Sequence, residues 1–191
     1  ADPVFFLRTK PVSVAAKWFL RNFKGKILYA VKANPSQIII DTIYQAGIRD
    51  FDVTSISEIE KVHQLQESRL YFMNPIKALH DIKIAYFKYG IRDFALDSQQ
   101  ELNKILAMTD CAKDLNLYIR IAVSNKFSKL PLESKFGISG KRAVSLLRDA
   151  REISQKLGVC FHVGSQAMQP STYSMAINRA FDLIEKSKVI V

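Results

Sequence analysis

Lys32 is the residue of this chain whose type and position are best suited to covalent chemistry. It directly follows an apolar segment, residues 27–31, that predicts a short strand, and Pro35 comes soon after it. A lysine at the tip of a strand faces either water or a pocket. In a pocket it loses hydration, its pKa falls, and the free amine becomes a nucleophile that can form a Schiff base with an aldehyde.

Other polar side chains lie at the carboxyl ends of the remaining predicted strands or within these strands. Because the carboxyl ends of parallel strands converge on one face of a barrel, we expect these side chains to share a site. With Lys32 they would supply an amine, an imidazole, hydroxyls, a guanidinium and carboxylates, a set that suits a phosphorylated, aromatic, amine-reactive cofactor. They are Asp52 with Thr54 and Ser55, Asn74, Asp97 with Ser98, Arg120, and His162 with Ser165.

Most of these residues also have an ordinary structural explanation. Arg120 is harder to explain in this way, because an arginine between Ile119 and Ile121 in a buried strand needs a partner to offset the cost of its charge. The ordinary explanations are helix caps for Asp52, Asp97 and Ser98, the third residue of a capping box for Glu58, a buried and satisfied histidine for His162, and a helix start for Ser165.

Apolar segments that predict strands alternate along the chain with segments of helical periodicity. The predicted strands span residues 27–32, 50–54, 70–74, 93–97, 116–123 and 159–165, and a last one begins at Val189. Helical periodicity marks residues 39–46, 59–65, 82–87, 102–106, 144–157 and 176–184. Two S-x-x-E capping boxes, Ser55 with Glu58 and Ser98 with Glu101, support two of these helices.

The alternation of strands and helices predicts an α/β fold with a parallel sheet, either open or closed into a barrel. The strands are apolar without clean alternation, which is typical of a parallel sheet covered on both faces. Residues 2–10 read as an extra strand outside this repeat, and residues 124–140 as a long insert after the fifth strand.

Composition narrows the partners that we expect. The formal charge is +10, but the lysines and arginines are scattered and no nucleic-acid motif accompanies them. No apolar run reaches the roughly 20 residues of a membrane helix, and there is no export signal. The two cysteines suggest no disulfide and favour a reducing cytoplasm. Neither a metal constellation nor a glycine-rich phosphate loop is visible.

Five stretches together resemble one family in order and spacing. The family is that of the fold-type III pyridoxal phosphate (PLP) decarboxylases, which belong to the alanine racemase-like barrel group. Within it, the last stretch is most similar to the ornithine decarboxylase branch of the ornithine, lysine and diaminopimelate decarboxylases. The stretches are residues 29–35 (YAVKANP), 51–55 (FDVTS) with 57–59 (SEI), 94–98 (FALDS) with 101–102 (EL), 134–137 (SKFG) and 161–166 (FHVGSQ).

The resemblance implies a (β/α)8 TIM-like barrel joined to a β domain, working as a head-to-tail homodimer. Residues 1–10 would be a strand that belongs to the β domain, and residues 11–191 a partial PLP-binding barrel, truncated after about six strand–helix units. Lys135 would contact the partner in the dimer.

The same resemblance implies a role for each candidate residue. Lys32 would be the catalytic lysine that bonds the aldehyde of PLP, and His162 would lie flat against the cofactor ring. Ser165 would lie near the cofactor phosphate. The remaining cofactor neighbours implied in this way are Asp52, Glu58 and Arg120.

The implied activity is decarboxylation of ornithine, or next of lysine, to a diamine in polyamine biosynthesis. The family pattern continues past the strand expected at Val189 with a glycine-rich phosphate loop, a carboxylate for the pyridine nitrogen, and residues of the β domain. We therefore expect the 191-residue piece alone to be inactive or nearly so. The alternative is a non-catalytic, decarboxylase-like decoy that binds a decarboxylase subunit or its regulator.

Overall fold

The computed structural model of the protein describes residues 1–191 except 1–3, 5, 124–127 and 131–135. The chain divides into two compact units, Ala1–Phe72 and Met73–Val191. In the part of the chain that the structure describes, no helix combines the length and the apolar composition needed to cross a membrane.

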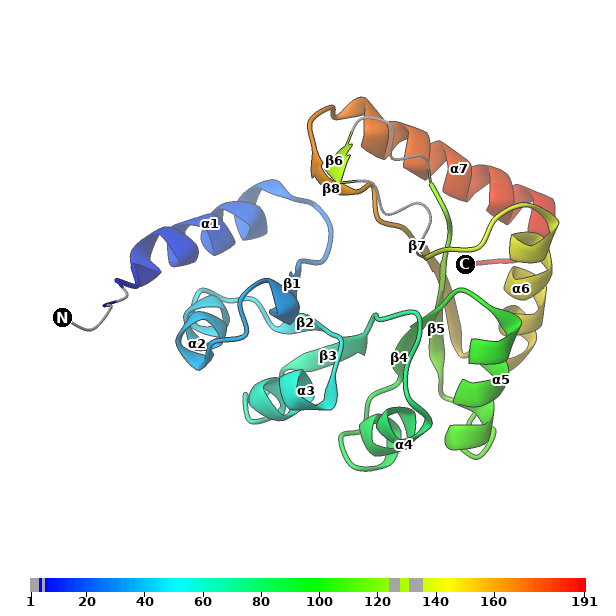
Figure 1. The fold of residues 1–191 in the computed structure, drawn as a ribbon, viewed down its shortest axis with the longest axis horizontal. Coiled ribbons are helices and arrows are strands. Elements are labelled where there is room, and N and C mark those ends of the chain that lie inside the picture. The colour runs from blue at the N-terminus through cyan, green and yellow to red at the C-terminus, as the bar shows by residue number, and fades with distance from the viewer. Residues whose placement is uncertain (1–3, 5, 124–127, 131–135) are drawn as a thin grey trace. The chain divides into compact units, whose positions relative to one another are not determined.

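The first unit alternates strands and helices in the order expected for strand–helix repeats (Figure 1). Its three strands are parallel, and β2 pairs with both β1 and β3. The elements are α1 (Thr9–Asn22), β1 (Leu28–Ala30), the short 3-10 helix η1 (Val31–Ala33), α2 (Gln37–Gln45), β2 (Asp50–Val53), α3 (Ile56–His63) and β3 (Arg69–Phe72).

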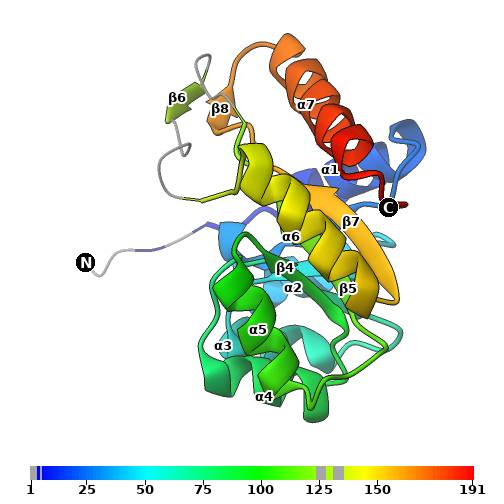
Figure 2. The ribbon, with the colours of Figure 1, turned by 90° about the vertical axis from the view of Figure 1, so that its right-hand side faces the viewer.

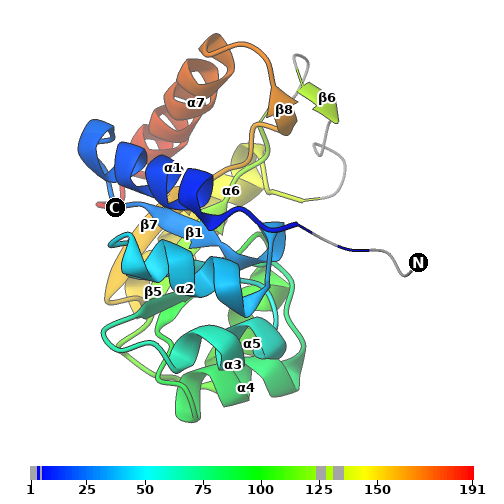
Figure 3. The same ribbon diagram turned by 90° about the vertical axis from the view of Figure 1, so that its left-hand side faces the viewer.

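The alternation of buried and partly buried side chains along β2 shows which face of this strand contributes to the core of the first unit. Along β2, Phe51 and Val53 are fully buried while Asp50 and Asp52 are only partly so. This alternation sends the carboxylates and the apolar groups to opposite faces of the strand. Helix α3 closes the core with Ile59 and Val62, and α1 lies beside α2 (Figure 3).

The second unit repeats the same strand–helix order and adds a short antiparallel pair of strands. Strand β5 pairs in parallel with β4 and β7, and β6 pairs antiparallel with β8. The elements are α4 (Leu79–Phe87), β4 (Asp93–Leu96), α5 (Gln99–Met108), β5 (Asn116–Arg120), β6 (Ser128–Leu130), α6 (Gly140–Ile153), β7 (Lys156–Cys160), β8 (Ser165–Ala167) and α7 (Ser171–Ser187).

Helices α5 and α6 cover one face of the parallel strands of the second unit (Figure 2). All four residues of β4 are buried, as expected for a central strand. Helix α7 packs beside α6, where Arg148 donates from Nε to the carbonyl of Ser187 over 3.1 Å.

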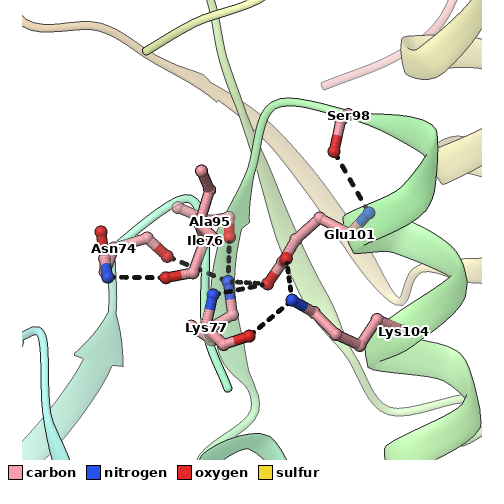
Figure 4. Close-up of polar contacts among 7 residues, drawn as sticks. All are labelled: Asn74, Ile76, Lys77, Ala95, Ser98, Glu101 and Lys104. Carbon is pink, nitrogen blue, oxygen red and sulfur yellow. Dashed lines mark hydrogen bonds and ion pairs between the residues drawn. The ribbon is translucent and has the colours of Figure 1, made fainter. Parts of the chain in front are cut away.

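A buried ion pair ties α5 to the loop that follows β3 (Figure 4). The Nζ atom of Lys77 lies 2.9 Å from Oε1 of Glu101, and the two side chains are 0% and 3% exposed. Glu101 also accepts from Lys104, whose Nζ lies 2.6 Å from Oε2. Burial of the ammonium group lowers the pKa of Lys77 to about 8, against the opposing effect of Glu101.

An internal repeat relates the strand–helix pairs around β2 and β4. The segment Gly-Ile-Arg-Asp-Phe leads into β2 at residues 47–51 and into β4 at residues 90–94. Each glycine has a positive φ, and the guanidinium of each arginine lies over a tyrosine of the preceding helix, 4.0 and 3.9 Å from the ring centroid. These pairs are Arg49 with Tyr44 and Arg92 with Tyr86.

The repeat continues through the strands into the next helices. Each aspartate accepts a hydrogen bond from a tyrosine hydroxyl of the following strand, over 3.0 Å for Asp50 and 2.9 Å for Asp93. Each serine after the strand caps the next helix. The equivalent positions are Thr54 and Asp97, Ser55 and Ser98, and Glu58 and Glu101.

The predicted strands are confirmed at β2 to β5, but four sequence expectations are wrong. The segment around Lys32 leaves the strand at Ala30 and forms η1, so the lysine lies on a 3-10 turn. The strand predicted for residues 159–165 is β7, Lys156–Cys160, and the helix predicted for 144–157 ends at Ile153. The chain from Val189 onward forms no strand.

The extra strand expected near the N-terminus is also not formed in the described residues. Val4 and residues 6–8 have no regular structure, and Thr9 begins α1. The assignment of residues 1–10 to a β domain stays a prediction. Within the long insert, residues 128–130 form β6, while Lys135 lies outside the described residues.

Candidate functional site

Lys32 lies at the carboxyl end of the first strand of the first unit. Ala30 pairs with Asp52, so the lysine and the end of β2 lie at the same end of the sheet. The backbone around the lysine is fixed by contacts of its motif: the Tyr29 hydroxyl donates to the carbonyl of Asn34 over 3.1 Å. The Lys32 side chain itself is exposed, and its amine is therefore accessible to a carbonyl compound.

The Glu58 carboxylate is held at the start of α3 by Thr54. Oε2 accepts from the Thr54 backbone N–H over 2.7 Å, and the threonine hydroxyl lies 3.2 and 3.1 Å from the two carboxylate oxygens. The cap itself is confirmed, because Ser55 Oγ accepts from the Glu58 N–H over 3.4 Å. Lys32, Asp52, Thr54 and Glu58 form the lysine cluster of the first unit.

Arg120 ends β5 in the second unit, and its charge has an aromatic partner. The guanidinium carbon lies 5.1 Å from the centroid of the Phe136 ring, within the range of a cation–π contact. This contact meets the expectation that an arginine in this strand needs a partner. Arg120 is opposite Cys160 in the parallel pair of β5 and β7, two residues before His162.

His162 follows the end of β7, and its imidazole is oriented by its own loop. Nδ1 accepts a hydrogen bond from the Gly164 N–H over 2.9 Å. Because Nδ1 is the acceptor, the neutral ring carries its proton on Nε2. The side chain is exposed, so the alternative of a buried core histidine is wrong.

Ser165 begins β8 rather than a helix, and the ordinary explanation for it is therefore wrong as well. It pairs with Leu130 of β6. We call Arg120, Phe136, His162 and Ser165 the histidine cluster of the second unit, because they lie at or beyond the carboxyl ends of the paired strands β5 and β7.

The two expected cap residues after β4 behave differently. Ser98 caps α5 by accepting the Glu101 N–H over 3.2 Å. Asp97 instead accepts the N–H of Gly137 over 2.9 Å, a contact that spans the insert after β5. Sequence reasoning missed this role; the glycine of the SKFG stretch was the only available signal.

Among the residues that the structure describes, no group of three or more metal-ligating side chains comes together. The chemistry of the two clusters is that of organic groups: an accessible amine, a neutral imidazole, a guanidinium, a hydroxyl and carboxylates.

Parallel strand–helix units with polar side chains at the strand ends define a class, the α/β barrel-type domain. Comparison with known proteins gives the family. The sequence profile of the pyridoxal-dependent decarboxylases, pyridoxal-binding domain, matches residues 11–190. The chain belongs to this family.

The relatives agree with this assignment. The chain is 34% identical over 169 residues to a lysine/ornithine decarboxylase of Selenomonas ruminantium, a match that covers 85% of this chain and 42% of that protein. It is 34% identical over 158 residues to antizyme inhibitor 2 of Xenopus laevis, covering 81% and 34%. The chain thus spans less than half the length of these relatives.

Solved structures show the same fold. The arginine decarboxylase of Paramecium bursaria Chlorella virus superposes with a TM-score of 0.83 at 27% identity, over 94% of this chain and 49% of that one. A variant of SrLDC solved with PLP gives a TM-score of 0.82 at 30% identity, over 93% and 46%.

The residues of this chain fit the cofactor of the family. An exposed lysine amine can condense with the PLP aldehyde, and a neutral, oriented imidazole can stack on an aromatic ring. Arg120 and the Ser165 hydroxyl are a cation and a donor of the kinds that bind phosphate. Taken separately, the lysine cluster offers an amine for the aldehyde of PLP, and the histidine cluster offers groups suited to its ring and its phosphate.

Proposed function

We propose that the full protein is a PLP-dependent decarboxylase of a basic amino acid, with ornithine the first candidate and lysine the next. The product is a diamine for polyamine synthesis, and the working form is a homodimer. The observation that carries the proposal is the family match over residues 11–190, which includes an exposed Lys32 directly after the first strand.

Lys32 and His162 are assigned the two central tasks. When bound, PLP supplies an aldehyde that amines attack and a ring that accepts the electron pair of a breaking bond. Lys32 would hold PLP through its ε-amine, the group of this chain that can condense with an aldehyde. His162, with its proton on Nε2, would lie against the cofactor ring and help to orient it.

The remaining residues bind and orient the cofactor. The Ser165 hydroxyl would donate a hydrogen bond to the phosphate, and Arg120 would add positive charge that favours an anionic ligand. Asp52 and Glu58 are neighbours of the cofactor and of Lys32. Thr54 supports this role of Glu58, because its backbone N–H and its hydroxyl hold the carboxylate in place.

A decarboxylation assay tests this proposal. The full-length protein, supplied with PLP, should release carbon dioxide and the corresponding diamine from ornithine or lysine. Lys32→Ala should abolish release, while Lys17→Ala, which removes an exposed lysine of α1, should leave it unchanged. No release from any basic amino acid by the wild-type protein would contradict the proposal.

A second candidate is a non-catalytic relative that binds a decarboxylase subunit or its regulator. The similarity to antizyme inhibitor 2 favours it. Native mass spectrometry of the full-length protein mixed with an intact ornithine decarboxylase separates the two functions. A heterodimer without decarboxylation by this protein supports the second candidate, and turnover by this protein alone rejects it.

A further inference from the structure

Asp97 makes a long-range contact that its position in sequence does not require. The serine beside it already caps α5, so the Asp97 carboxylate is not needed for the cap. Its Oδ2 accepts the backbone N–H of Gly137 over 2.9 Å. The aspartate thereby connects the end of β4 to residues 136–138, the arginine-clamp segment.

The arginine-clamp segment lies directly on the backbone that follows β5. Gly137 has a φ of +102°, and a Cβ atom built on it would lie 2.6 Å from the Ala122 nitrogen and 2.8 Å from the Ile121 carbonyl carbon. Neither the backbone conformation nor this space allows a side chain. The segment needs a glycine at this position to approach so closely.

Both the main chain and the side chain of Arg120 contact the arginine-clamp segment. The Arg120 carbonyl accepts the Ile138 N–H over 2.9 Å, and the Ala122 N–H donates to the Ile138 carbonyl, also over 2.9 Å. The Phe136 ring faces the guanidinium at 5.1 Å. Whatever fixes this segment therefore also fixes Arg120.

The end of β4, from which Asp97 projects, is itself firmly held (Figure 4). The buried Nζ of Lys77 donates to the carbonyl of Ala95 over 2.6 Å and pairs with Glu101. The strand backbone two residues before Asp97 is thus anchored by a buried ammonium group.

The internal repeat places Asp97 at the position that a threonine, Thr54, occupies in the first unit. At the equivalent position of the first unit, Thr54 donates to Glu58. In the second unit the equivalent Glu101 is paired with Lys77, and an ionised aspartate has no proton to donate to it. Asp97 is instead an acceptor, directed to the Gly137 N–H.

We propose that Asp97 is a positioning residue for cofactor binding. Its carboxylate holds the arginine-clamp segment on β5, and the segment in turn fixes the guanidinium of Arg120 for an anionic group of the cofactor. The inference rests on the proposed function, because Arg120 has its cofactor-binding role only there.

Three variants of the full-length protein test the inference. Asp97→Ala removes the acceptor, while Asp97→Asn keeps an oxygen that can accept the same N–H. Ser98→Ala is the matched control, because it weakens α5 at the next residue without touching the arginine-clamp segment. Two quantities are measured for each: the Kd of PLP, and amide hydrogen exchange at Gly137 and Ile138 in the protein without PLP.

The expected pattern separates positioning from stability. Asp97→Ala should raise the Kd about tenfold, the effect of losing one charge-assisted hydrogen bond, and should speed exchange at Gly137 by a similar factor. Asp97→Asn should restore the Kd of PLP and the exchange rate at Gly137. Ser98→Ala should lower Tm without changing either of these two quantities. An unchanged Kd in Asp97→Ala, or an equal loss in Ser98→Ala, overturns the inference.

The exchange measurement keeps this result distinct from the proposed function. If the wild-type protein binds no PLP, the proposed function fails, and with it the role assigned to Arg120. The contact between Asp97 and the arginine-clamp segment is then still decided by exchange: unchanged protection at Gly137 in Asp97→Ala rejects it.

Discussion

Lys77 carries its ammonium group into the core of the second unit, where three oxygens surround it. These are Oε1 of Glu101 and the carbonyls of Asn74 and Ala95, at 2.9, 2.9 and 2.6 Å. A buried charge is tolerated only when it is paired and hydrogen-bonded in this way. The residue therefore links the loop after β3, the strand β4 and the helix α5.

Removal of this ammonium group should destabilise the fold strongly. Lys77→Met leaves Glu101 buried, with Lys104 as its remaining cationic partner among the residues that the structure describes. We expect a loss of about 3 kcal/mol in the free energy of unfolding at neutral pH. Lys83→Met, at an exposed lysine of α4, should change it by less than about 0.5 kcal/mol. Urea denaturation measures both, and equal effects would show that the pair contributes no stability.

The stability that depends on Lys77 should also change with pH in a defined direction. Its pKa is about 8 in the folded chain against 10.5 for the free side chain, so between these values the unfolded state binds more protons. The free energy of unfolding should therefore rise from pH 8 to pH 10.5 relative to that of Lys77→Met. Parallel curves for the two proteins across this window would contradict the lowered pKa.

At the scale of the elements, the sequence predicted the N-termini of α3 and α5 best. Ser55 and Ser98 accept the N–H of the third residue on, as the S-x-x-E pattern predicts. Ser36 also precedes a helix, α2, with an extended backbone, but its φ is −69° against about −150° for the other two serines, and its side chain makes no such bond. The three serines thus offer a direct comparison of cap and non-cap.

The caps should each contribute measurable stability. We expect Ser55→Ala and Ser98→Ala to lower the free energy of unfolding by about 1 kcal/mol each, because an N–H at the helix start loses its acceptor. Ser36→Ala is the control and should have almost no effect. Thermal unfolding of the three variants checks this, and a loss in Ser36→Ala equal to the others would refute the assignment.

Other elements could not be placed from sequence, because contacts far along the chain decide them. Ile153 and Leu157 have helical spacing, yet Ser154 ends α6 and Leu157 enters β7, where it pairs with Leu117. Pairing with β5 overrides the local periodicity. The segment before Lys32 is apolar like a strand, but η1 replaces its last residues.

In the candidate site, too, local sequence predicted some features, while contacts between distant residues decided others. The residue types and motifs indicated Lys32, Arg120 and His162, and the structure locates each at the carboxyl end of a strand. The partners of the two equivalent glutamates were not predictable: Glu58 binds the nearby Thr54, and Glu101 binds Lys77, 24 residues away. Local sequence shows both only as capping residues.

At the scale of the whole molecule, the chain belongs to the pyridoxal-dependent decarboxylases and spans less than half of the relatives described above. The inactivity of the 191-residue piece alone, the homodimer and the reducing cytoplasm stay predictions. If the piece lacks part of the cofactor site, it should bind PLP more weakly than the full-length protein. Equal Kd values by fluorescence titration would show that these 191 residues contain the complete binding site.

The attachment of PLP to Lys32 is the central claim, and one measurement tests it directly. The full-length protein is incubated with PLP, reduced with borohydride and digested, and mass spectrometry then locates the added mass. We predict a single modified peptide, with the cofactor on Lys32. Attachment at another lysine, or at none, would contradict the account.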